Sequence, residues 1–476
     1  MTSEIGGYDR QRSAANNART RLGHMPATRR SSALTTALVV GTCGLWLVLG
    51  YLNKARCAGP PFDEWGRSLI FDSIKDTRVC YSDIQLLWIG RDIDRHVFPY
   101  VSGGIDADGM LFGGTVEYPV LSGLLMWLGA LGAHTDAEFL AHSALLLAPF
   151  GLLTAWMLGR LAGKWALLWS LTPPLVLYAF HNWELPVVAT AVAAVFVMAT
   201  DRIPIRVRAV LAAVLLAIGF CLKIYPGLFV LPLAVYVLTY GRSRGRGYDV
   251  RGALATIGAA VVTVVAINLP FAIAGYEGWR ASFAFQENRT ADITTNSIWF
   301  WGLRPMFGVS IDETAPDAYH TVVGILSPLL VLAAFALAVH LGWRRMEHSG
   351  GHYPWIAVSA MMLCGFLLLH KVHSPQYTLW LLPFFVLLRV PWGLVAAYLV
   401  ADLAMGIGVF SYFGALSEGD DAATWQFVVD VGVWGRAVLL VVLFVVFARA
   451  PLRGSRDDAD SGPPTRHAAV AGRRPS

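Results

Sequence analysis

The chain has 476 residues, of which 56% are hydrophobic and only 14% are charged, and its mean hydropathy is +0.54. Soluble globular domains carry roughly 25% charged residues, so this composition excludes an ordinary soluble protein and predicts a polytopic membrane protein. The formal net charge of +5 comes mainly from arginines in short loops and tails, which favours membrane orientation and anionic lipid over nucleic-acid binding.

The chain begins with a basic tail, residues 1–32, which holds six arginines among small polar residues. We predict a disordered cytoplasmic arm there, a single transmembrane domain over 33–448, and a second disordered cytoplasmic tail over 449–476. Apolar segments long enough to cross a bilayer, or nearly so, recur along the whole domain. They lie at about 33–52, 118–133, 139–159, 165–180, 184–200, 208–222, 226–240, 253–273, 320–342, 354–370, 376–390, 392–413 and 426–448.

Arginines in the short loops predict the orientation of these segments. Loops at 202–208, 242–246 and 344–345 are predicted to be cytoplasmic. Five regions then lie on the outer side, namely 53–117, 181–184, 223–226, 274–319 and 371–376. Thirteen crossings would leave the two basic tails on opposite sides of the membrane. We therefore predict about twelve crossings, with one segment between 118 and 184 that does not span, or else with Arg160 and Lys164 outside.

The first outer loop, 53–117, holds the densest group of acids in the chain. Carboxylates at a membrane edge are costly to hold beside hydrocarbon, so acids that gather there usually serve chemistry, binding or ion traffic. Residues Ser82 to Gln85 have the spacing of a capping box, which predicts a short interfacial helix with Asp83 in its first turn. Asp83 is then either an active-site base or only a partner of the helix dipole.

Other acids of this loop have plainer interpretations. Asp92 and Asp94 flank Arg91 and Arg95, which favours solvated ion pairs. Glu117 comes just before Tyr118-Pro119 at a predicted helix start, where a helix-starting acid and a site residue are comparable alternatives.

Lysine usage is the second informative feature, because only five of the 37 basic residues are lysines. Two of them, Lys223 and Lys371, lie at outer ends of apolar segments. Lysine suits phosphate as a compact charge, although snorkelling to lipid headgroups is the commoner explanation for any single case. The loop from 274 adds Arg289 and Asp292 among tryptophans and phenylalanines, which suits either an interfacial aromatic belt or a sugar platform beside an anion site.

One kind of enzyme needs all these parts together. A carboxylate would accept a hydroxyl proton, cations would stabilise a departing phosphate, aromatic and amide groups would bind sugar, and the membrane would deliver a lipid donor. The sequence therefore predicts a glycosyltransferase that uses a polyprenyl-phosphate sugar. In a single inverting displacement one aspartate acts as the base, and no second carboxylate is needed as a nucleophile.

The same residues carry a family resemblance over about 80–385. An aspartate in the first outer loop, the Glu117 to Pro119 run, Leu222 to Pro226, Asn288-Arg289 to Trp299, and Lys371 to Pro383 resemble actinobacterial GT-C transferases. The most similar group is the GT87 family, the polyprenol-phosphate-mannose-dependent α-1,2-mannosyltransferases. Members often carry a His-His pair before the Trp-Leu-Leu-Pro run, where this chain has Gln376-Tyr377.

This resemblance implies a GT-C-like all-α bundle of about twelve transmembrane helices, with a large first extracytoplasmic loop that carries short interfacial helices. It implies a cell-membrane enzyme that transfers mannose to a cell-envelope glycolipid or polysaccharide on the extracytoplasmic side. Asp83 matches the catalytic base, and Lys223 and Arg289 would lie near the donor phosphate. The predicted substrate-binding set is Glu117, Lys223, Tyr225, Arg289, Asp292, Lys371, His373, Gln376 and Tyr377.

Cysteines and histidines leave two further questions open. Cys57 and Cys80 both fall in the first outer loop, where they form either a disulfide or two free thiols. His370 and His373 lie three residues apart without a third ligand, which favours polar lining over a metal site. We expect no cofactor beyond the lipid-linked sugar as co-substrate, with a carboxylate-bound divalent ion in the first loop as an alternative.

A transporter or flippase of lipid-linked or small polar substrates is the rival class. Helices interrupted by proline, as at Thr172-Pro173-Pro174, would suit it. Against it, no internal repeat is visible and the ionisable residues gather at one face. A noncatalytic partner of cell-envelope enzymes is a third class, for which the sequence offers no positive sign.

Overall fold

The computed structural model of the chain describes residues 33–242, 245–311 and 313–453. The two predicted tails fall outside these residues, apart from the first few residues after 449. Within the described part, seven helical segments are long and apolar enough to cross a membrane, and four shorter apolar helices accompany them. The prediction of an all-α polytopic membrane protein is confirmed.

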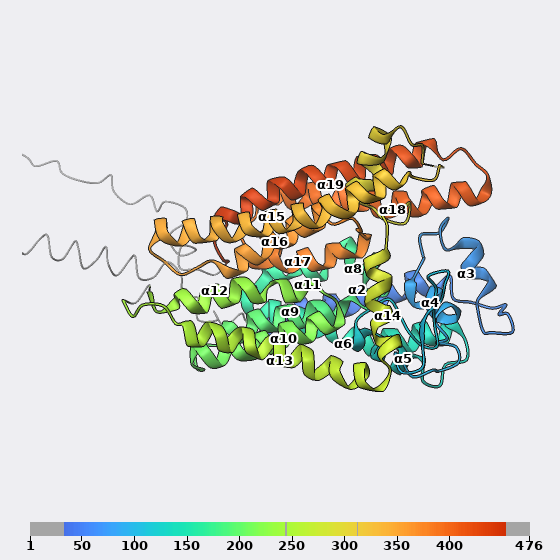
Figure 1. The fold of residues 1–476 in the computed structure, drawn as a ribbon. Helices are drawn as coiled ribbons and strands as arrows, with labels where there is room; N and C mark the ends of the chain where they lie inside the picture. The colour runs from blue at the N-terminus through green and yellow to red at the C-terminus, as the bar shows by residue number, and fades with distance from the viewer. Residues whose placement is uncertain (1–32, 243–244, 312, 454–476) are drawn as a thin grey trace, which may run out of the picture.

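The first half of the chain forms short elements between two long helices and then a series of apolar helices (Figure 1). In order they are α2 (Ala33–Ala55), α3 (Leu69–Ile74), α4 (Asp83–Gly90), β1 (Gly104–Ile105), β2 (Leu111–Phe112), α5 (Val120–Ala130), α6 (Asp136–Ala162), η1 (Gly163–Ala166), α7 (Leu167–Ser170), α8 (Pro173–Tyr178), α9 (Glu184–Met198), α10 (Ile205–Leu222), α11 (Tyr225–Leu228) and α12 (Val230–Tyr240). The strands β1 and β2 pair antiparallel, with Gly104 opposite Phe112.

The second half contains the longest helices. In order its elements are α13 (Val250–Ala274), α14 (Tyr276–Asn288), η3 (Trp299–Leu303), η4 (Arg304–Phe307), α15 (Asp317–Ser349), α16 (Trp355–Leu369), η5 (Pro375–Tyr377), α17 (Thr378–Leu387), α18 (Trp392–Glu418) and α19 (Ala423–Arg449). The long helices lie side by side, while α14 runs across one end of them (Figure 1).

The bundle has two different ends. We call the end that holds α3, α4, α5 and α14 the loop face (Figure 1). The opposite end, which we call the terminal face, holds both ends of the described chain. Thr36 packs near Gly159 at the end of α6, and the Arg453 guanidinium lies 3.9 Å from the Trp165 ring centroid a few residues further on. Both ends of the described chain therefore lie on the same face.

Helix α5 is the predicted apolar segment that does not cross. Ser122 near its start donates a hydrogen bond to the Leu222 carbonyl at the loop face, and Trp127 near its end donates one to the carbonyl of His96 in the first loop. Just after it, the backbone N–H of Asp136 bonds to the carbonyl of Gly66. Both ends of α5 thus contact the loop face. Its 11 residues span about 16 Å, too short for a ~30 Å hydrocarbon core.

Two crossings are built from short, broken helices. The segment 163–180 runs from Trp165 at the terminal face to His181, whose carbonyl accepts the N–H of Asp83 at the loop face. Helix α17 starts after Tyr377 at the loop face, and the next residues pair with the end of the chain, where Arg389 N–H bonds to the Pro451 carbonyl. These short segments and the long helices carry the described chain back and forth between the two faces.

Burial separates the inner helices from the outer ones. Every residue of α17 is buried and so are twelve of the fifteen residues of α16, so neither helix shows a polar stripe. A helix that is apolar on all sides belongs inside a bundle or a membrane. In contrast, α13 and α15 turn large apolar side chains outward, among them Leu254, Val262 and Leu332, each 62–67% exposed. These outer helices form the surface that suits contact with lipid.

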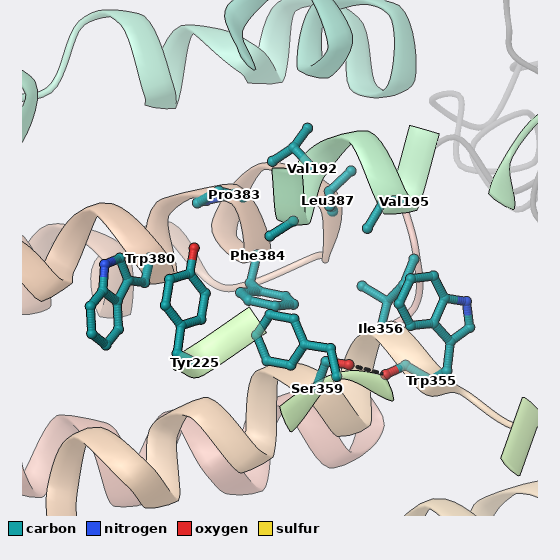
Figure 2. A pocket seen from close by; sticks show the side chains of 12 residues that line it. Val192, Val195, Tyr225, Trp355, Ile356, Ser359, Trp380, Pro383, Phe384 and Leu387 are labelled. Atoms are coloured by element: carbon teal, nitrogen blue, oxygen red, sulfur yellow. Dashed lines mark hydrogen bonds between the residues drawn. The ribbon is translucent and has the colours of Figure 1, made fainter. Parts of the chain in front are cut away.

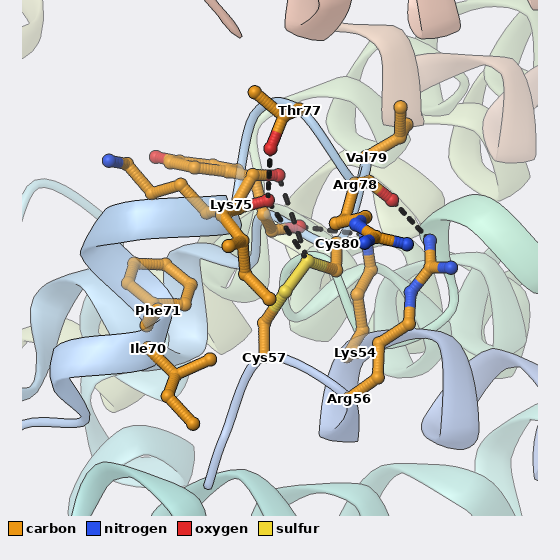
Figure 3. The surroundings of a disulfide bond; sticks show 12 residues. Lys54, Arg56, Cys57, Ile70, Phe71, Lys75, Thr77, Arg78, Val79 and Cys80 are labelled. Carbon is orange, nitrogen blue, oxygen red and sulfur yellow. Dashed lines mark hydrogen bonds between the residues drawn. A yellow bond between two sulfur atoms is a disulfide. The ribbon is translucent and has the colours of Figure 1, made fainter. Parts of the chain in front are cut away.

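The first loop is attached to the end of α2. A disulfide joins Cys57, just after α2, to Cys80, just before α4, so the structure contains the cross-link that the sequence left open (Figure 3). Ser82 caps α4 by accepting the backbone N–H of Ile84, which confirms the predicted helix start. The other half of the predicted capping box is wrong, because the Gln85 side chain instead donates to the Cys57 carbonyl.

Candidate active site

All five predicted outer regions meet at the loop face, and Asp83 lies where the first two of them touch. Its Oδ1 accepts a hydrogen bond from the Tyr81 hydroxyl at 2.7 Å, and its Oδ2 accepts one from Asn182 Nδ2 at 2.6 Å. Its backbone N–H is bound by the His181 carbonyl. The Asp83 side chain is only partly buried. Two neutral donors therefore orient a carboxylate that keeps access to the outside.

Tyr118 extends this network toward the next helix. Asn182 Nδ2 also donates to the Tyr118 hydroxyl, at 2.7 Å, so one amide links Asp83 to the residue after Glu117. Burial raises the pKa of Tyr81 and of Tyr118 well above the ordinary value, and the negative charge of Asp83 raises both further. Both phenols therefore remain neutral, and the Tyr81 hydroxyl donates a hydrogen bond to the Asp83 carboxylate.

Lys223 lies beside Tyr118 but forms an ion pair with Glu184. Its ammonium donates to Glu184 Oε1, while Glu184 Oε2 accepts the Trp380 indole N–H at 2.6 Å. Glu184 is fully buried and Lys223 is 7% exposed. The Lys223 ammonium also lies 4.9 Å from the Tyr118 ring centroid and 5.8 Å from that of Tyr377, within cation–π range. The structure thus gives Lys223 a carboxylate partner, and its predicted contact with phosphate stays a prediction.

Tyr225 and Tyr377 form an aromatic stack with Trp380. The Trp380 ring lies 4.3 Å from Tyr225 and 3.9 Å from Tyr377, with nearly parallel planes. Tyr225 and Trp380 line a cavity of ≈ 20 Å³ whose other walls are almost entirely apolar (Figure 2). A cavity of this volume holds about one water molecule. Tyr225, predicted to bind substrate, therefore faces a space too small for a sugar, while Tyr377 is partly exposed on the Lys223 side of the stack.

Arg289 and Lys371 come together in a second cavity at the loop face, which has a volume of ≈ 190 Å³. It lies between the end of α14, the start of α15 and the loop before α17. The Lys371 ammonium donates to the Glu287 carbonyl at 3.1 Å. The full lining is Asn288, Arg289, Thr290, Ala291, His320, Val323, Gly324 and Lys371. With two cations, a histidine and no acid in its lining, this cavity suits an anion.

Two acids of the predicted substrate-binding set, Glu117 and Asp292, form hydrogen bonds within the protein. Glu117 accepts hydrogen bonds from Arg91, with 2.8 Å between Nε and Oε2, and its carbonyl accepts the Gln286 amide of α14 at 2.6 Å. It lies three residues before the start of α5, so the helix-starting interpretation is wrong. Asp292 accepts both the N–H and the hydroxyl of Thr294, which closes a local turn.

The expected ion pairing of the acids at 92 and 94 is confirmed for Asp92 and not for Asp94. Asp92 pairs with Arg95 at 3.5 Å and accepts the backbone N–H of Gly113. Asp94 makes no ion pair within 4.0 Å in the described part of the chain, and burial raises its pKa. Arg91, which was expected to pair with these acids, binds Glu117 instead.

His373 and Gln376 point away from the loop face into the helix bundle. His373 is 2% exposed, and its ring contacts the Arg436 guanidinium of α19. Burial and the charge of Arg436 hold the pKa of His373 well below its ordinary value. Gln376 is 4% exposed. Arg436 itself is 3% exposed within α19 and was not predicted from the sequence. His373 therefore anchors the loop that carries Lys371 and Tyr377.

Metal-ligating side chains do not converge over the described ranges, where no group of three or more His, Cys, Asp or Glu side chains could hold an ion. His370, the partner of His373 in the sequence, bonds through its own Nδ1 to the Val372 carbonyl and stacks on Phe366. Burial lowers the pKa of His370, and the charges of Lys371 and Arg289 lower it further.

Sequence reasoning missed three residues that organise this face: Lys54, Asn182 and Glu184. Each is at least 98% buried, and each lies at an end of an apolar segment. A single ionisable or amide residue at such a position costs free energy unless it has a partner, which is the signal that would have selected them. Their partners are far away in the sequence, so the signal indicates a contact without saying which one.

No protein-family model matches the chain, and no curated protein matches it. Among solved structures, the chain is similar to ArnT from Cupriavidus metallidurans, both in a crystal structure bound to undecaprenyl phosphate and in the apo state. The TM-scores are 0.39 and 0.38, with 15% and 14% sequence identity. Each match covers 88% of this chain and 78% of ArnT. Similarity at this level assigns neither a family nor a function to the chain.

Proposed function

We propose that the protein is a membrane glycosyltransferase that moves a sugar from a polyprenyl-phosphate donor to a cell-envelope glycolipid or polysaccharide. The observation that supports this most directly is the setting of Asp83. Its carboxylate is partly exposed, and two neutral groups orient it. It shares the loop face with the cationic cavity of Arg289 and Lys371.

Asp83 is the proposed general base. In the proposed reaction, a hydroxyl oxygen of the acceptor attacks the anomeric carbon while Asp83 takes the hydroxyl proton. The bond from the anomeric carbon to the phosphate oxygen breaks, and the phosphate leaves with the bonding electrons. The sugar configuration inverts in this single displacement, because no covalent sugar–enzyme intermediate forms.

Arg289 and Lys371 are proposed to bind the phosphate of the lipid donor. Arginine contacts phosphate through a planar set of donors, and lysine adds a compact charge. These cations would stabilise the negative charge that grows on the phosphate as it departs. The aromatic residues around Lys223, including Tyr377, would form the wall between the two sites.

The sugar and the side of the membrane are proposed from the sequence. The resemblance to GT87 transferases supports mannose as the sugar. Arginines gather on the terminal face, where Arg345 bonds to the carbonyls of Ala448 and Ala450. Positively charged residues favour the cytoplasmic side, so the loop face with Asp83 is proposed to be extracytoplasmic.

Isolated membranes that carry Asp83→Asn test the proposal, with polyprenyl-phosphate-[14C]mannose as the probe and endogenous acceptors. Loss of a general base should reduce transfer by roughly 10²–10⁴-fold. Donor binding should persist in this variant, whereas the double variant Arg289→Gln with Lys371→Gln should lose it. Asp108→Asn, which changes an exposed acid of the same loop, is the matched control and should transfer normally. Native transfer by Asp83→Asn would overturn the catalytic assignment.

A further inference from the structure

The end of α2 holds the segment before Asp83 through four separate contacts. Side chains of Asn53, Lys54 and Arg56 donate hydrogen bonds to the carbonyls of Val79, Tyr81 and Arg78, respectively. The disulfide between Cys57 and Cys80 joins the same two segments (Figure 3). The backbone that leads into Asp83 is therefore fixed to one helix end.

The contact made by Lys54 differs from the other three because it involves a buried charged group. Its side chain is 2% exposed, and its ammonium lies 2.7 Å from the Tyr81 carbonyl oxygen. The hydroxyl of the same tyrosine donates to Asp83 Oδ1. In the described part of the chain Lys54 makes no ion pair within 4.0 Å. A buried ammonium is costly without a compensating negative charge, and the Asp83 carboxylate is bound to the same tyrosine whose carbonyl holds Lys54.

We propose that Lys54 is a positioning residue for Asp83, which favours the ionised carboxylate and holds Tyr81 against it. This inference rests on the proposed function, since it gives Lys54 its role through the base of that reaction. Lys54 is a cation outside the predicted substrate-binding set, which contains Lys223, Arg289 and Lys371. In the structure, Lys223 has its own carboxylate in Glu184, and the other two line the separate cavity.

Other groups that face Asp83 do not supply a competing positive charge. Tyr81 and Tyr118 are neutral donors. His181 remains neutral because burial, with the charges of Lys54 and Lys223, holds its pKa well below the ordinary value. Asn182 is an uncharged amide. The nearby acid, Glu117, is paired with Arg91, and Lys223 is paired with Glu184.

The expected effect has a definite sign. Asp83 must be ionised to accept a proton, and a nearby positive charge favours the ionised form. Removal of the Lys54 charge takes this stabilisation away. Transfer that depends on this carboxylate is lost as the pH falls, so in the variant the loss begins at a higher pH. At the alkaline end of the tested range, the variant and the native protein should differ least.

The experiment measures transfer of [14C]mannose from its polyprenyl phosphate in membranes between about pH 4.5 and pH 8.5. Lys54→Gln retains a donor for the Tyr81 carbonyl but removes the charge, and Lys54→Met removes both. For Lys54→Gln the acidic limb of the profile should move up by about one pH unit, which corresponds to up to about tenfold less activity than native at the acidic end. Lys164→Gln, an exposed lysine at the terminal face, is the matched control and should have the native profile.

A second measurement separates this inference from the proposed function. Thermal unfolding of the full chain in detergent identifies a variant that fails to fold, and Lys54→Gln is compared with native protein only at equal folded content. If Lys54→Gln loses the same factor at every pH, while Asp83→Asn is inactive, Lys54 has only a structural role and the inference is overturned. If Asp83→Asn remains active, the proposed function itself fails.

Discussion

Asp83 and Glu184 both begin helices at the loop face, yet the two acids differ in burial and in the charge of their partners. Glu184 is fully buried, and its two oxygens are taken by the Lys223 ammonium and the Trp380 indole. Asp83 is partly exposed, and its direct partners are the neutral side chains of Tyr81 and Asn182. Position in a helix therefore does not decide the role of an acid at this face. The charge of its partners and its access to the outside do.

The comparison also shows how the two acids are connected. Asn182 binds Asp83 and lies two residues before Glu184, so the start of α9 positions both. A buried ion pair is held rigidly by the cost of separating its charges, and it gives the adjacent amide a fixed place. We infer that the ion pair between Glu184 and Lys223 stabilises the start of α9. Asp83, which the same segment positions, is the acid proposed to react.

Loss of the Glu184 charge should have the largest effect on stability. Glu184→Gln leaves the Lys223 ammonium buried without a carboxylate, which costs roughly 3–5 kcal/mol. Asp83→Asn should cost less, because its carboxylate is partly exposed and makes no ion pair within 4.0 Å with the Lys54 ammonium. Thermal unfolding in detergent measures both. Equal destabilisation by the two variants would show that Glu184 does not contribute more to stability than Asp83.

The double variant Glu184→Leu with Lys223→Met serves as the control for that measurement. Replacement of both charges by apolar groups should restore most of the stability, since neither charge is left without a partner. Loss of donor binding in this stable double variant would support the phosphate contact that the sequence predicted for Lys223.

Loss of the disulfide should have an intermediate effect on stability, and this effect should be confined to the segment that leads to Asp83. Cys57→Ser with Cys80→Ser removes a cross-link between residues 23 apart in the sequence, which is worth roughly 3 kcal/mol in the chain-entropy description. Transfer should fall because the segment before Asp83 loses its attachment to α2. Native protein treated with a reductant should show the same loss.

The same variant also separates the two regions. A reductant should not reduce its transfer any further, since no disulfide remains to break. Hydrogen exchange of the start of α9 around Glu184 should stay at the native level. Faster exchange there would show that the disulfide supports both acids rather than Asp83 alone.

Removal of a single hydrogen bond to Asp83 should have the smallest effect. Tyr81→Phe deletes the donor to Oδ1, which is worth about 0.5–1.5 kcal/mol, or roughly 2–10-fold in kcat, without removing the carboxylate. Tyr276→Phe, at an exposed tyrosine of α14, is the control and should leave kcat unchanged. A loss as large as that of Asp83→Asn would mean that Tyr81 takes part in proton transfer itself.

Several features of the molecule follow from short stretches of sequence. The hydropathy predicts the membrane class, because each apolar segment carries its own signal. Ser82 predicts the start of α4, because a serine cap acts within two or three residues. The distribution of arginines predicts that five regions share one face, and in the structure these regions meet at the loop face.

Other features lay outside what those stretches could predict. Helix α5 has the same kind of apolar sequence as a crossing helix, and only its contacts with His96 and Leu222 show that it stays at one face. The sequence left the pairing of Cys57 with Cys80 open, since spacing alone does not bring two thiols together. Lys223 was expected beside phosphate, whereas the fold brings it to Glu184, 39 residues away.

By itself, the sequence determined that this chain is an all-α polytopic membrane protein and that Asp83 starts a capped helix in an acidic loop. Only the tertiary structure decided which partner each charge received. Lys54 binds the Tyr81 carbonyl because the end of α2 is joined to the first loop, and Lys223 binds Glu184 because α9 and α10 pack together. The physical reason is that capping and hydropathy act over a few residues, whereas the partner of a buried charge depends on which helix ends the packed bundle brings together.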